Sequence, residues 1–457
     1  MNHANRITFS ALALGIAGVL AMGQAHASGF QLRESSVKNL GRSNAGSAVN
    51  NDDATVVTGN PAAMSGFDKT TVRADVTAID LSFKFKGGGV AAAGFGPAAP
   101  ALTGSDGGDA GDLTPVPNIS AIFPMHGALE GLTIGASIGA PFGLKTEYED
   151  GWVGRYHALK SEVKTVDFTL SASVKLHERF SVGGGFIYER ADATLTKAID
   201  FGTALCTGSG NPLNCFNPAF PFHPQSHDGA ISIDGDSTGI GWLAGVQWQP
   251  TDSLTIGYSH RSEIDHEIEG DIDFTVPAAV QAGLGPLAAG FADGPGGADL
   301  TTPSIDTISL RYDFTDNFRL LADWQATDWS SLRTVDVRRS NGISLGAEEF
   351  DWKDTEFYSL GAEWDMNDAL TLRAGFGMDE TPTHDETRTP RLPDNDRKLY
   401  SIGLTWQVTD AFSVDAAFQR IEVDNPRINV VSSSGSLLVG EAEGSANLYG
   451  IAGQFKF

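Results

Sequence analysis

From about residue 70 to its carboxyl end, the chain alternates apolar residues with polar or small ones at a period of two. Successive side chains of a β-strand point to opposite faces, so the alternation predicts strands with one apolar and one polar face. Phe180, Val182 and Tyr188 share one such face, while serine, glycine and glutamate occupy the other. The same pattern recurs in residues 166–176, 254–259, 318–325, 370–376 and 412–419. The sequence therefore predicts an all-β fold.

Two kinds of connection separate the strands. Six short polar turns are expected at residues 125–130, 177–179, 250–253, 315–317, 365–368 and 409–411. Seven long loops are expected at residues 87–112, 143–160, 201–228, 276–302, 340–351, 380–397 and 425–443. The two kinds alternate strictly, which gives fourteen strands. An even strand number, with short turns at one end and long loops at the other, is typical of antiparallel outer-membrane β-barrels and would not be required of a soluble sandwich.

Aromatic residues mark the strand ends near the short turns and resemble an interfacial girdle: Trp248, Phe314, Phe318, Trp364, Trp406 and Phe412. The last strand alternates up to Phe457, and a terminal aromatic there resembles the signal by which the outer-membrane assembly machinery recognises its substrates. An ordinary final strand is the alternative.

The first strand contains a change of phase. Val72, Ala74 and Val76 set one apolar face, whereas Ile79, Leu81, Phe83 and Phe85 set the other. A β-bulge near Ala78 would absorb the change. Otherwise the strand begins later, and its first residues belong to the preceding segment.

Residues 1–27 have the composition of a secretory signal peptide. Arg6 precedes an apolar run from Ile7 to Met22, and Ala25-His26-Ala27 forms a small-residue cleavage site. A membrane anchor is the alternative, but the run is shorter than the roughly 20 residues that a spanning helix needs. No other stretch reaches 18 uninterrupted apolar residues, so the mature chain would have to cross a membrane with strands.

Composition excludes some functions. A net charge of -26 and a pI near 4.6 exclude general affinity for nucleic acid or anionic head groups, since both require a basic face. The mean hydropathy of -0.12 is too polar for a helical membrane protein, but it suits a barrel in which only alternate residues meet lipid.

Cys206 and Cys215 are expected to form a disulfide within one loop of an exported chain, with metal ligation as the weaker alternative.

Residues 28–69 are the only sizeable mature segment without the period-two alternation that predicts strands. A fourteen-stranded barrel encloses a lumen that side chains alone do not fill. This segment is long enough to fold inside it and, with several charged residues, too polar to span lipid. It is predicted to be a plug, with the barrel itself formed by residues 70–457.

Two sets of motifs then point to a known family. The first is Gly29-Phe30-Gln31-Leu32, Leu40-Gly41-Arg42 with Ala45-Gly46, Asp52-Asp53-Ala54 and Asn60-Pro61-Ala62. The second is Pro382, Arg388-Thr389-Pro390, Leu392-Pro393-Asp394, Asp396-Arg397 and Ser401 with Gly403. Together they resemble FadL, the long-chain fatty acid transporter family, and its toluene-transporter relatives. The resemblance covers essentially the whole mature chain.

The resemblance implies a hydrophobic cargo that is captured by an apolar groove in the outer loops, moved to a site inside the barrel and released sideways. It also implies a kinked third strand that opens the wall, and a hatch whose start moves when ligand binds. The hatch residues expected to bind the ligand or to gate its passage are Phe30, Gln31, Leu32, Asn60, Pro61 and Ala62.

Three further expectations concern the route of the cargo. The third strand, residues 132–141, carries Gly135, Gly139 and Pro141, which permit a kink; alternatively, a loop begins at Pro141. Apolar residues in loops 201–228 and 276–302 suggest a binding groove or loops packed on each other. A fatty acid carboxylate calls for a cation. The candidates are Arg155, Arg388 and Arg397, each of which could instead belong to an ion pair.

Other chemistry receives little support. Residues 135–139 and 235–239 match Gly-x-Ser-x-Gly, centred on Ser137 and Ser237, but both lie in strand patterns rather than in a strand-to-helix elbow. Asp106, Asp109 and Asp112 lack the spacing of a calcium loop. The chain has no G-x-x-x-x-G-K nucleotide-binding loop. We therefore predict no catalysis, cofactor or metal.

The sequence thus predicts a monomeric, passive outer-membrane transporter of long-chain fatty acids, which contacts outer-membrane lipid. Uptake of aromatic or other uncharged hydrocarbons is the alternative within the family. A lipid hydrolase and an open porin are the rivals from other classes.

Overall fold

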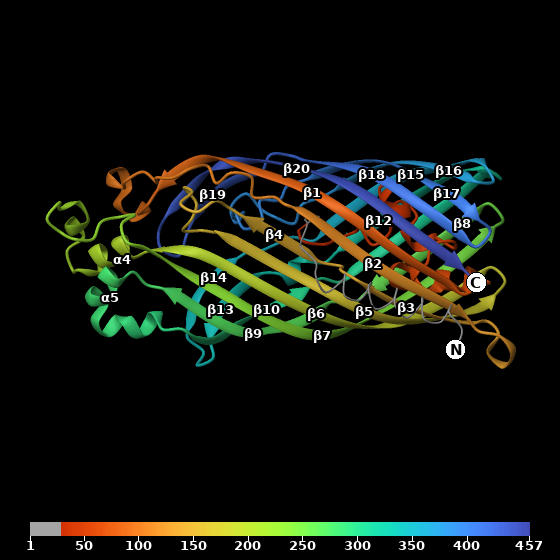
Figure 1. Cartoon of the computed structure of the whole chain (residues 1–457), viewed down its shortest axis with the longest axis horizontal. Helices are drawn as coiled ribbons and strands as arrows, with labels where there is room; N and C mark the ends of the chain where they lie inside the picture. Colours follow the sequence, from red (N-terminus) through yellow and green to blue (C-terminus); the bar gives the residue numbers. More distant parts are fainter. Residues whose placement is uncertain (1–28) are drawn as a thin grey trace.

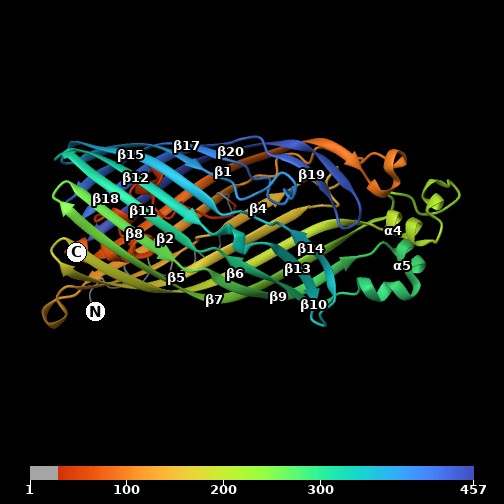
Figure 2. The ribbon, with the colours of Figure 1, turned by 180° about the vertical axis from the view of Figure 1, so that it is seen from behind.

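The computed structural model describes residues 29–457, so the expected signal peptide at 1–27 lies outside the described residues. Within them, a single antiparallel sheet of twenty strand segments curls until β1 pairs with β20 and closes a barrel. Figure 1 shows the long cylinder that results, and Figure 2 shows it from behind. None of the helices in residues 29–457 is long and apolar enough to cross a membrane.

Fourteen strands form the wall, which confirms the predicted number. They are β1 (Thr71–Val90), β2 (Leu113–Pro124), β3 (Leu132–Gly139), β5 (Lys160–His177), β6 (Phe180–Asp200), β7 (Asp228–Thr251), β8 (Leu254–Arg261), β11 (Ile305–Thr315), β12 (Phe318–Thr327), β15 (Thr355–Asn367), β16 (Leu370–Asp379), β17 (Arg397–Thr409), β18 (Phe412–Val423) and β20 (Leu437–Lys456). Six shorter segments continue six of these strands away from the turns: β4 (Gly143–Glu147), β9 (Ile264–Thr275), β10 (Gly294–Thr302), β13 (Thr334–Arg339), β14 (Ser344–Glu349) and β19 (Arg427–Val431).

The two ends of the cylinder differ. The short turns lie at the end that carries the carboxyl terminus, and the long connections lie at the other end with α4 (Phe201–Gly208) and α5 (Ala278–Leu284) (Figure 1). Five of the expected loops are partly strand. Loop 87–112 begins with the end of β1, and loops 143–160, 276–302, 340–351 and 425–443 contain β4, β10, β14 and β19. Near the turns, the outward-facing side chains of Trp248, Trp364 and Trp406 are about half exposed, as an aromatic girdle requires.

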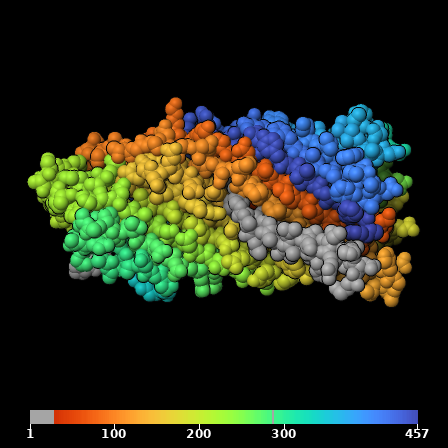
Figure 3. Space-filling view, in the orientation of Figure 1, coloured from red at the N-terminus to blue at the C-terminus, as the bar shows by residue number. Residues whose placement is uncertain are grey.

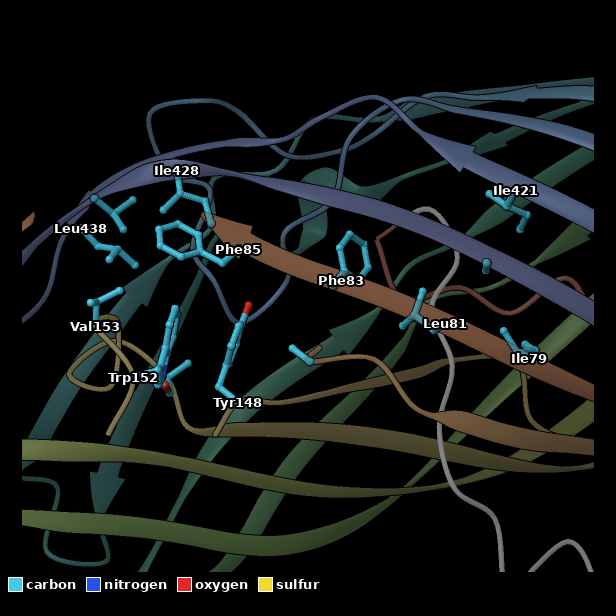
Figure 4. Close-up of a cluster of buried hydrophobic side chains, with 14 of the residues drawn as sticks. Ile79, Leu81, Phe83, Phe85, Tyr148, Trp152, Val153, Ile421, Ile428 and Leu438 are labelled. Atoms are coloured by element: carbon cyan, nitrogen blue, oxygen red, sulfur yellow. Dashed lines mark hydrogen bonds between the residues drawn. The ribbon is translucent and has the colours of Figure 1, made fainter. Parts of the chain in front are cut away.

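The change of phase in the first strand is neither a bulge nor a late start. β1 pairs with β20 without a register shift from Thr71 to Val90. In its first half, polar Arg73 and Asp75 point inward, whereas in its second half apolar side chains, including Phe83 and Phe85, point inward (Figure 4). The outward-facing residues change at the same point from apolar, as at Val76, to polar, as at Asp80 and Lys84, while the interior changes from polar to apolar.

That apolar interior fills the outer half of the barrel. Phe85 packs edge-on against Trp152 with 5.6 Å between ring centroids, and Trp152 stacks on Tyr148 at 3.9 Å. Burial raises the pKa of Tyr148, whose hydroxyl donates to the carbonyl oxygen of Pro390 at 2.8 Å. Figure 4 shows these rings converging from β1 and from the connection between β4 and β5. The outer loops are therefore packed inward rather than left loose.

Residues 29–70, which we call the inner segment, lie inside the barrel near the turns, and most of their side chains are buried. They form α2 (Val37–Leu40), η1 (Ser47–Val49), α3 (Val56–Gly59) and η2 (Pro61–Gly66). The wall is rich in glycine where it meets them. A Cβ atom at Gly375 would lie 2.1 Å from the carbonyl carbon of Arg42, so only glycine admits the backbone of the inner segment there.

Buried charges join the inner segment to the wall. Arg73 of β1 contacts Asp53 at 3.2 Å and Asp415 of β18 at 2.5 Å. Arg42 pairs with Glu363 of β15, and the backbone N–H of Gly46 donates to Asp323 of β12 at 2.5 Å. Breaking a buried pair leaves a charge without compensation, so each of these contacts holds the inner segment in one position.

Candidate functional site

An apolar cavity of about 90 Å³ lies beside Phe30, among β4, β5, β6, β7, β9, β10, β13 and β14. Its lining is almost entirely aliphatic and aromatic, and it includes Phe30, Leu144, Val163, Ile268, Leu300, Leu332, Val335, Phe350, Trp352 and Leu392. Phe30 forms its floor with an exposed fraction of 3%. The cavity can hold an apolar group away from water.

An aromatic cage surrounds Phe30. Its ring lies 4.8 Å from Trp329, 5.8 Å from Phe142 and 5.9 Å from Trp352, measured between centroids. The neighbouring Gly29 has a φ of +57°, and a Cβ atom there would lie 2.9 Å from both indole rings. Glycine is therefore needed before Phe30, because no side chain fits between the two tryptophans.

The start of the inner segment pairs with an interruption in the wall. β3 ends at Gly139 and β4 begins at Gly143, and both pair with β5. Across this break, Leu32 donates its backbone N–H to the carbonyl oxygen of Pro141, and Gly143 donates to that of Phe30, both at 2.7 Å. Three residues of the inner segment thus act as a short strand over the break.

The break also leaves a gap beside β2. β2 pairs with β3 only from Ile119 to Pro124, and β4 pairs only with β5 among the described strands. Residues 113–118 of β2 therefore lack a strand partner on this side, although Asn118 donates its side-chain N–H to the carbonyl oxygen of Ser35 at 2.7 Å. In place of a continuous ladder, the inner segment closes the lower part of the gap. Further up, the Glu147 N–H donates to the carbonyl oxygen of Ala110 at 3.1 Å and Lys145 pairs with Asp112 at 2.8 Å.

A second, polar cavity of about 150 Å³ lies between the inner segment and this break. It is lined by Gln31, Leu32 and Arg33, by Gly139 and Pro141 of the break, and by residues of β5, β8, β11 and β12. Arg261 borders it and pairs with Asp167 at 2.5 Å and Glu189 at 2.7 Å. Phe30 and its aromatic neighbours thus separate an apolar compartment from a polar one.

A third cavity of about 520 Å³ lies on the loop side of the apolar one. Arg391, Glu348, Leu195, Ile233 and Val337 line both cavities, so Arg391 stands at their junction. Its guanidinium contacts Glu348 at 3.3 Å and donates to Ser161 at 3.0 Å.

His157 also lines the third cavity. Burial, together with the nearby charges of Arg391 and Lys197, lowers its pKa to about 4. The third cavity thus has two cations, Arg391 and Lys197, and three carboxylates, Glu348, Glu349 and Glu386, in its lining next to the apolar compartment.

The three arginines predicted to meet a carboxylate are already engaged, and none of them lines the apolar or the third cavity. Arg155 pairs with Asp228 at 2.8 Å and donates to the carbonyl oxygen of Thr103 at 2.6 Å, so it ties three loops together. Arg388 pairs with Asp385, and Arg397 pairs with Asp394. Arg391, which lines both of these cavities, lies in the same motif, but no sequence signal separates it from Arg388.

The predicted hatch residues fall into two groups. Phe30, Gln31 and Leu32 lie at the break and the cavities, as described above. Asn60 instead anchors η2: its side chain accepts from the N–H of Ala62 at 3.1 Å and donates to the carbonyl oxygens of Ala48 and of Val246. Pro61 and Ala62 pack against β6, where a Cβ atom at Gly183 would lie 2.6 Å from the Ala62 nitrogen.

The glycines of the third strand also serve different purposes. Gly139 and Pro141 lie at the break. Gly135 lies lower in β3, where an added Cβ would meet Met64 and Val57 of the inner segment, so it permits close packing rather than a kink. Ser137 donates to Asn118 at 3.1 Å, and both Gly-x-Ser-x-Gly runs lie within strands, β3 and β7.

The outer loops pack on each other and leave some apolar surface. Cys206 and Cys215 form a disulfide between α4 and η5 (Pro212–Phe216). Phe201 contacts Phe291 of η6 (Gly285–Phe291) at 4.9 Å and packs with Val280 and Leu284. Leu213 remains 71% exposed and Phe216 44%. In Figure 3 these loop residues form the end of the molecule opposite the carboxyl terminus.

Within residues 29–457, no group of three or more His, Cys, Asp and Glu side chains could hold a metal ion.

Comparison with known proteins gives a consistent result. Residues 18–457 match the family described as outer membrane protein transport protein (OMPP1/FadL/TodX). Outer membrane protein P1 of Haemophilus influenzae is 29% identical over 405 residues, which cover 85% of this chain and 84% of that protein. The long-chain fatty acid transport protein of Escherichia coli K12 is 27% identical over 413 residues, covering 87% and 88%.

Solved structures agree in fold. A Pseudomonas aeruginosa FadL homologue superposes with a TM-score of 0.84 at 25% identity, covering 94% of this chain and all of that one. The toluene transporter TodX of Pseudomonas putida superposes with a TM-score of 0.64 at 14% identity, covering 92% and 97%.

Proposed function

The chain belongs to the OMPP1/FadL/TodX family of outer-membrane transport proteins, and we propose that its cargo is a long-chain fatty acid, taken up passively across the bacterial outer membrane. The long-chain fatty acid transport protein of Escherichia coli, among the relatives, supports this cargo. No catalytic step is part of the proposal, since both Gly-x-Ser-x-Gly runs lie within strands.

One observation carries the choice of cargo: an apolar cavity with a cation at its mouth. Arg391 is the only Lys or Arg among the described residues that line this cavity. A fatty acid has the matching form, with an acyl chain for the aliphatic lining and a carboxylate for the guanidinium. We assign the head group to Arg391, with Lys197 beside it, in place of Arg155, Arg388 and Arg397.

The size of the cavity implies a gate. Its volume of about 90 Å³ is well below the roughly 300 Å³ at which small-molecule pockets begin. An acyl chain therefore fits only if Phe30 leaves the floor. Residues 28–69 act as a hatch in this proposal, and withdrawal of Phe30, Gln31 and Leu32 frees the break between β3 and β4. The cargo then leaves sideways past residues 113–118 of β2.

Two further parts of the proposal concern the membrane. The chain works as a monomer in contact with outer-membrane lipid. Phe457, which is 64% exposed and follows the last strand, is presented to the assembly machinery.

The alternative cargo is an uncharged aromatic hydrocarbon. The three aromatic rings around Phe30 favour it, because they would pack against an aromatic molecule as readily as against the Phe30 ring. Such a cargo would make no use of Arg391.

The deciding experiment uses a strain that lacks its own transporters of this family. We expect this chain to restore growth on oleate and not on toluene. Purified protein should bind oleate more tightly than oleyl alcohol, which has the same chain without the carboxylate. Growth restored on toluene alone, or equal binding of the two C18 compounds, would contradict the proposed cargo.

A further inference from the structure

We propose that Asp167 and Glu189 share one proton inside the barrel, and that Asp167 gives this proton to the carboxylate of the cargo beside the break between β3 and β4. The cargo then enters the lipid as a neutral carboxylic acid. This proton transfer rests on the proposed function, because it takes a fatty acid as the cargo and the break as its exit. It involves four side chains, Asp167, Glu189, Arg261 and His266, which we call the carboxyl cluster.

The four side chains of the carboxyl cluster come from four neighbouring strand segments. Asp167 of β5 and Glu189 of β6 are directly opposed residues of an antiparallel pair. Arg261, the last residue of β8, contacts Asp167 at 2.5 Å and Glu189 at 2.7 Å. His266 of β9 contacts Glu189 through Nε2 at 2.9 Å. Two acidic groups thus share a single guanidinium and one imidazole.

The imidazole of His266 is neutral in this arrangement. Its Nε2 atom faces the carboxylate of Glu189 and therefore carries the ring proton. Its Nδ1 atom is buried and has no hydrogen-bond partner among the described residues. A second ring proton would create a donor without an acceptor, and a charge, on a residue that is only 1% exposed. His266 therefore supplies a hydrogen bond to the cluster and no positive charge.

Counting charges leaves one proton to place. With both carboxyl groups ionised, the guanidinium of Arg261 offsets only one of the two negative charges. Asp167 and Glu189 are both buried, and a buried charge without compensation is strongly destabilising. One bound proton makes the carboxyl cluster neutral. The pair of carboxyl groups therefore holds a proton that neither would keep in water at neutral pH.

Hydrogen bonds place this proton on Asp167. Glu189 accepts at Oε1 from His266 and from the Thr302 hydroxyl, and at Oε2 from Arg261, and these donors favour its ionised form. Oδ1 of Asp167, in contrast, is buried and accepts no hydrogen bond from the described residues. An O–H group on Asp167 can donate to Glu189 opposite, as in other pairs of carboxyl groups that share one proton.

The shared proton lies at the proposed exit. Asp167 is paired with Gly139, the last residue of β3 before the break. It also lines the polar cavity together with Pro141 of the break. The next residue, Phe168, points outward and is 41% exposed. A carboxylate that passes the break therefore comes beside Asp167, and only the backbone of β5 separates this residue from the outer surface of the wall.

The other charged or titratable side chains that line the polar cavity have partners of their own. Besides Asp167 and Arg261, they are Arg33, His260 and Asp323 within the described part of the chain. Arg33 pairs with Asp379 at 2.7 Å, and His260 contacts Asp306 at 3.0 Å. Asp323 accepts from backbone N–H groups of the inner segment. The carboxyl oxygen at this cavity that lacks a hydrogen bond is therefore that of Asp167.

The transfer moves one proton and changes no other bond. The O–H bond of Asp167 breaks, and the proton forms an O–H bond with the carboxylate of the cargo, which becomes a carboxylic acid. The carboxyl cluster is left with one net negative charge until Asp167 takes a proton from water in the emptied cavity. A carboxylate is far more costly to move into hydrocarbon than a neutral acid. The transfer therefore speeds the exit of an acid and has no effect on an alcohol.

Asp167→Asn is the central test, because asparagine has the shape of a protonated aspartate and leaves Glu189 and Arg261 as a balanced pair. We expect this variant of the full mature chain to keep the thermal stability of the unsubstituted protein. Its infrared spectrum at neutral pH should lack the C=O stretching band of one protonated carboxyl group. Glu189→Gln should also lack this band, since Asp167 alone would then ionise against Arg261.

The entry of cargo into the bilayer gives the second measurement. Protein in phospholipid nanodiscs that contain a fluorescent lipid is loaded with a spin-labelled C18 acid or the matching alcohol, which quenches the fluorescence on entering the lipid. General acids contribute 100-fold or more to rates, so we expect Asp167→Asn to slow entry of the acid by roughly 100-fold and that of the alcohol by less than about twofold.

Glu162→Gln provides the matched control. It removes a carboxylate from the same strand, one that pairs with Lys160 at 2.7 Å and lines none of the three cavities. This variant should keep the infrared band of the protonated carboxyl group and both rates of entry.

An unchanged carboxyl band in Asp167→Asn and Glu189→Gln would overturn the shared proton, as would a loss of stability in Asp167→Asn of the kind that a broken ion pair gives. Equal slowing of acid and alcohol would overturn the proton transfer, because Asp167 would then only support the wall. If the C18 acid does not bind the unsubstituted protein, the proposed cargo fails, whereas the infrared spectra still decide whether the carboxyl cluster holds a proton.

Discussion

Gly143 donates its backbone N–H to the carbonyl oxygen of Phe30 at 2.7 Å, which places the first residues of the inner segment on the broken third strand of the wall. Strand order alone would leave that break open, because among the strands of residues 29–457 β4 pairs only with β5. The inner segment thus completes the wall as well as filling the lumen. This hydrogen bond, and the one from the Leu32 N–H to the carbonyl oxygen of Pro141, would have to break for a molecule to leave sideways.

A reversible crosslink should lock this pairing. Gln31 and Phe142 face each other between the two hydrogen bonds, as a non-hydrogen-bonded antiparallel pair whose Cα atoms are close enough for a disulfide. We expect Gln31→Cys with Phe142→Cys, in a chain that also carries Cys206→Ser and Cys215→Ser, to block oleate uptake when oxidised. Reduction should restore it, as measured with radiolabelled oleate in cells.

Each single cysteine variant provides the control, because it alters the same side chains without a crosslink. Undiminished uptake by the oxidised double variant, with the crosslink verified by mass spectrometry, would show that the hatch does not leave the break during transport.

Removal of the Phe30 ring should open the floor of the apolar cavity. Phe→Ala changes in packed sites cost roughly 3–5 kcal/mol, so Phe30→Ala should loosen the start of the inner segment. We expect a measurable ion conductance in planar bilayers, where the unsubstituted protein conducts little. Phe67→Ala removes a buried ring elsewhere in the inner segment and should leave the conductance low. Equal conductance in the two variants would argue against a special role for Phe30.

Neutralising Arg391 should weaken the binding of charged cargo selectively. A hydrogen bond to a charged group contributes about 1.5–3 kcal/mol, so Arg391→Gln should raise the Kd for oleate roughly 10- to 150-fold and leave that for oleyl alcohol nearly unchanged. Calorimetric titration in detergent measures both. Arg155→Gln should change the two affinities equally, because Arg155 ties loops together and lines neither cavity. If Arg155→Gln weakened only oleate binding, and Arg391→Gln changed both affinities equally, Arg155 would be the residue that binds the carboxylate.

The hatch should lose stability as the pH rises. Burial raises the pKa of Glu34 from 4.5 to about 7, and its Oε2 atom lacks a partner within the described chain. The folded segment therefore binds the proton more tightly than an unfolded one. Its stability should be greatest below pH 4.5 and fall by roughly 3 kcal/mol up to about pH 7, with no further loss from this group above that value.

Exchange of amides in residues 30–40 between pH 5 and 8, corrected for the intrinsic rate, measures this change. Glu34→Gln should abolish it, and Glu178→Gln, at an exposed turn, should not. A pH dependence that survives Glu34→Gln would assign it to another group.

The sequence by itself determined the barrel. Alternation at a period of two is a local property of each strand, and the lengths of the turns and loops separate the two ends, so fourteen strands could be counted without contacts. The phase change in β1 is likewise visible in the sequence. Its cause is tertiary: the same face of the strand points inward throughout, towards polar partners up to Thr77 and towards an apolar interior from Ile79 onward.

Only the tertiary structure decided which charged groups border a cavity. Arg388, Arg391 and Arg397 lie in one short motif and all three are ion-paired, with Asp385, Glu348 and Asp394, yet of the three only Arg391 lines the apolar and the third cavity. The reason is that the contacts of the site join residues distant in the chain: Gly29 meets Asp394 across 365 positions. Local pattern fixes strands, whereas the partner of a buried charge depends on which strands the closed barrel brings together.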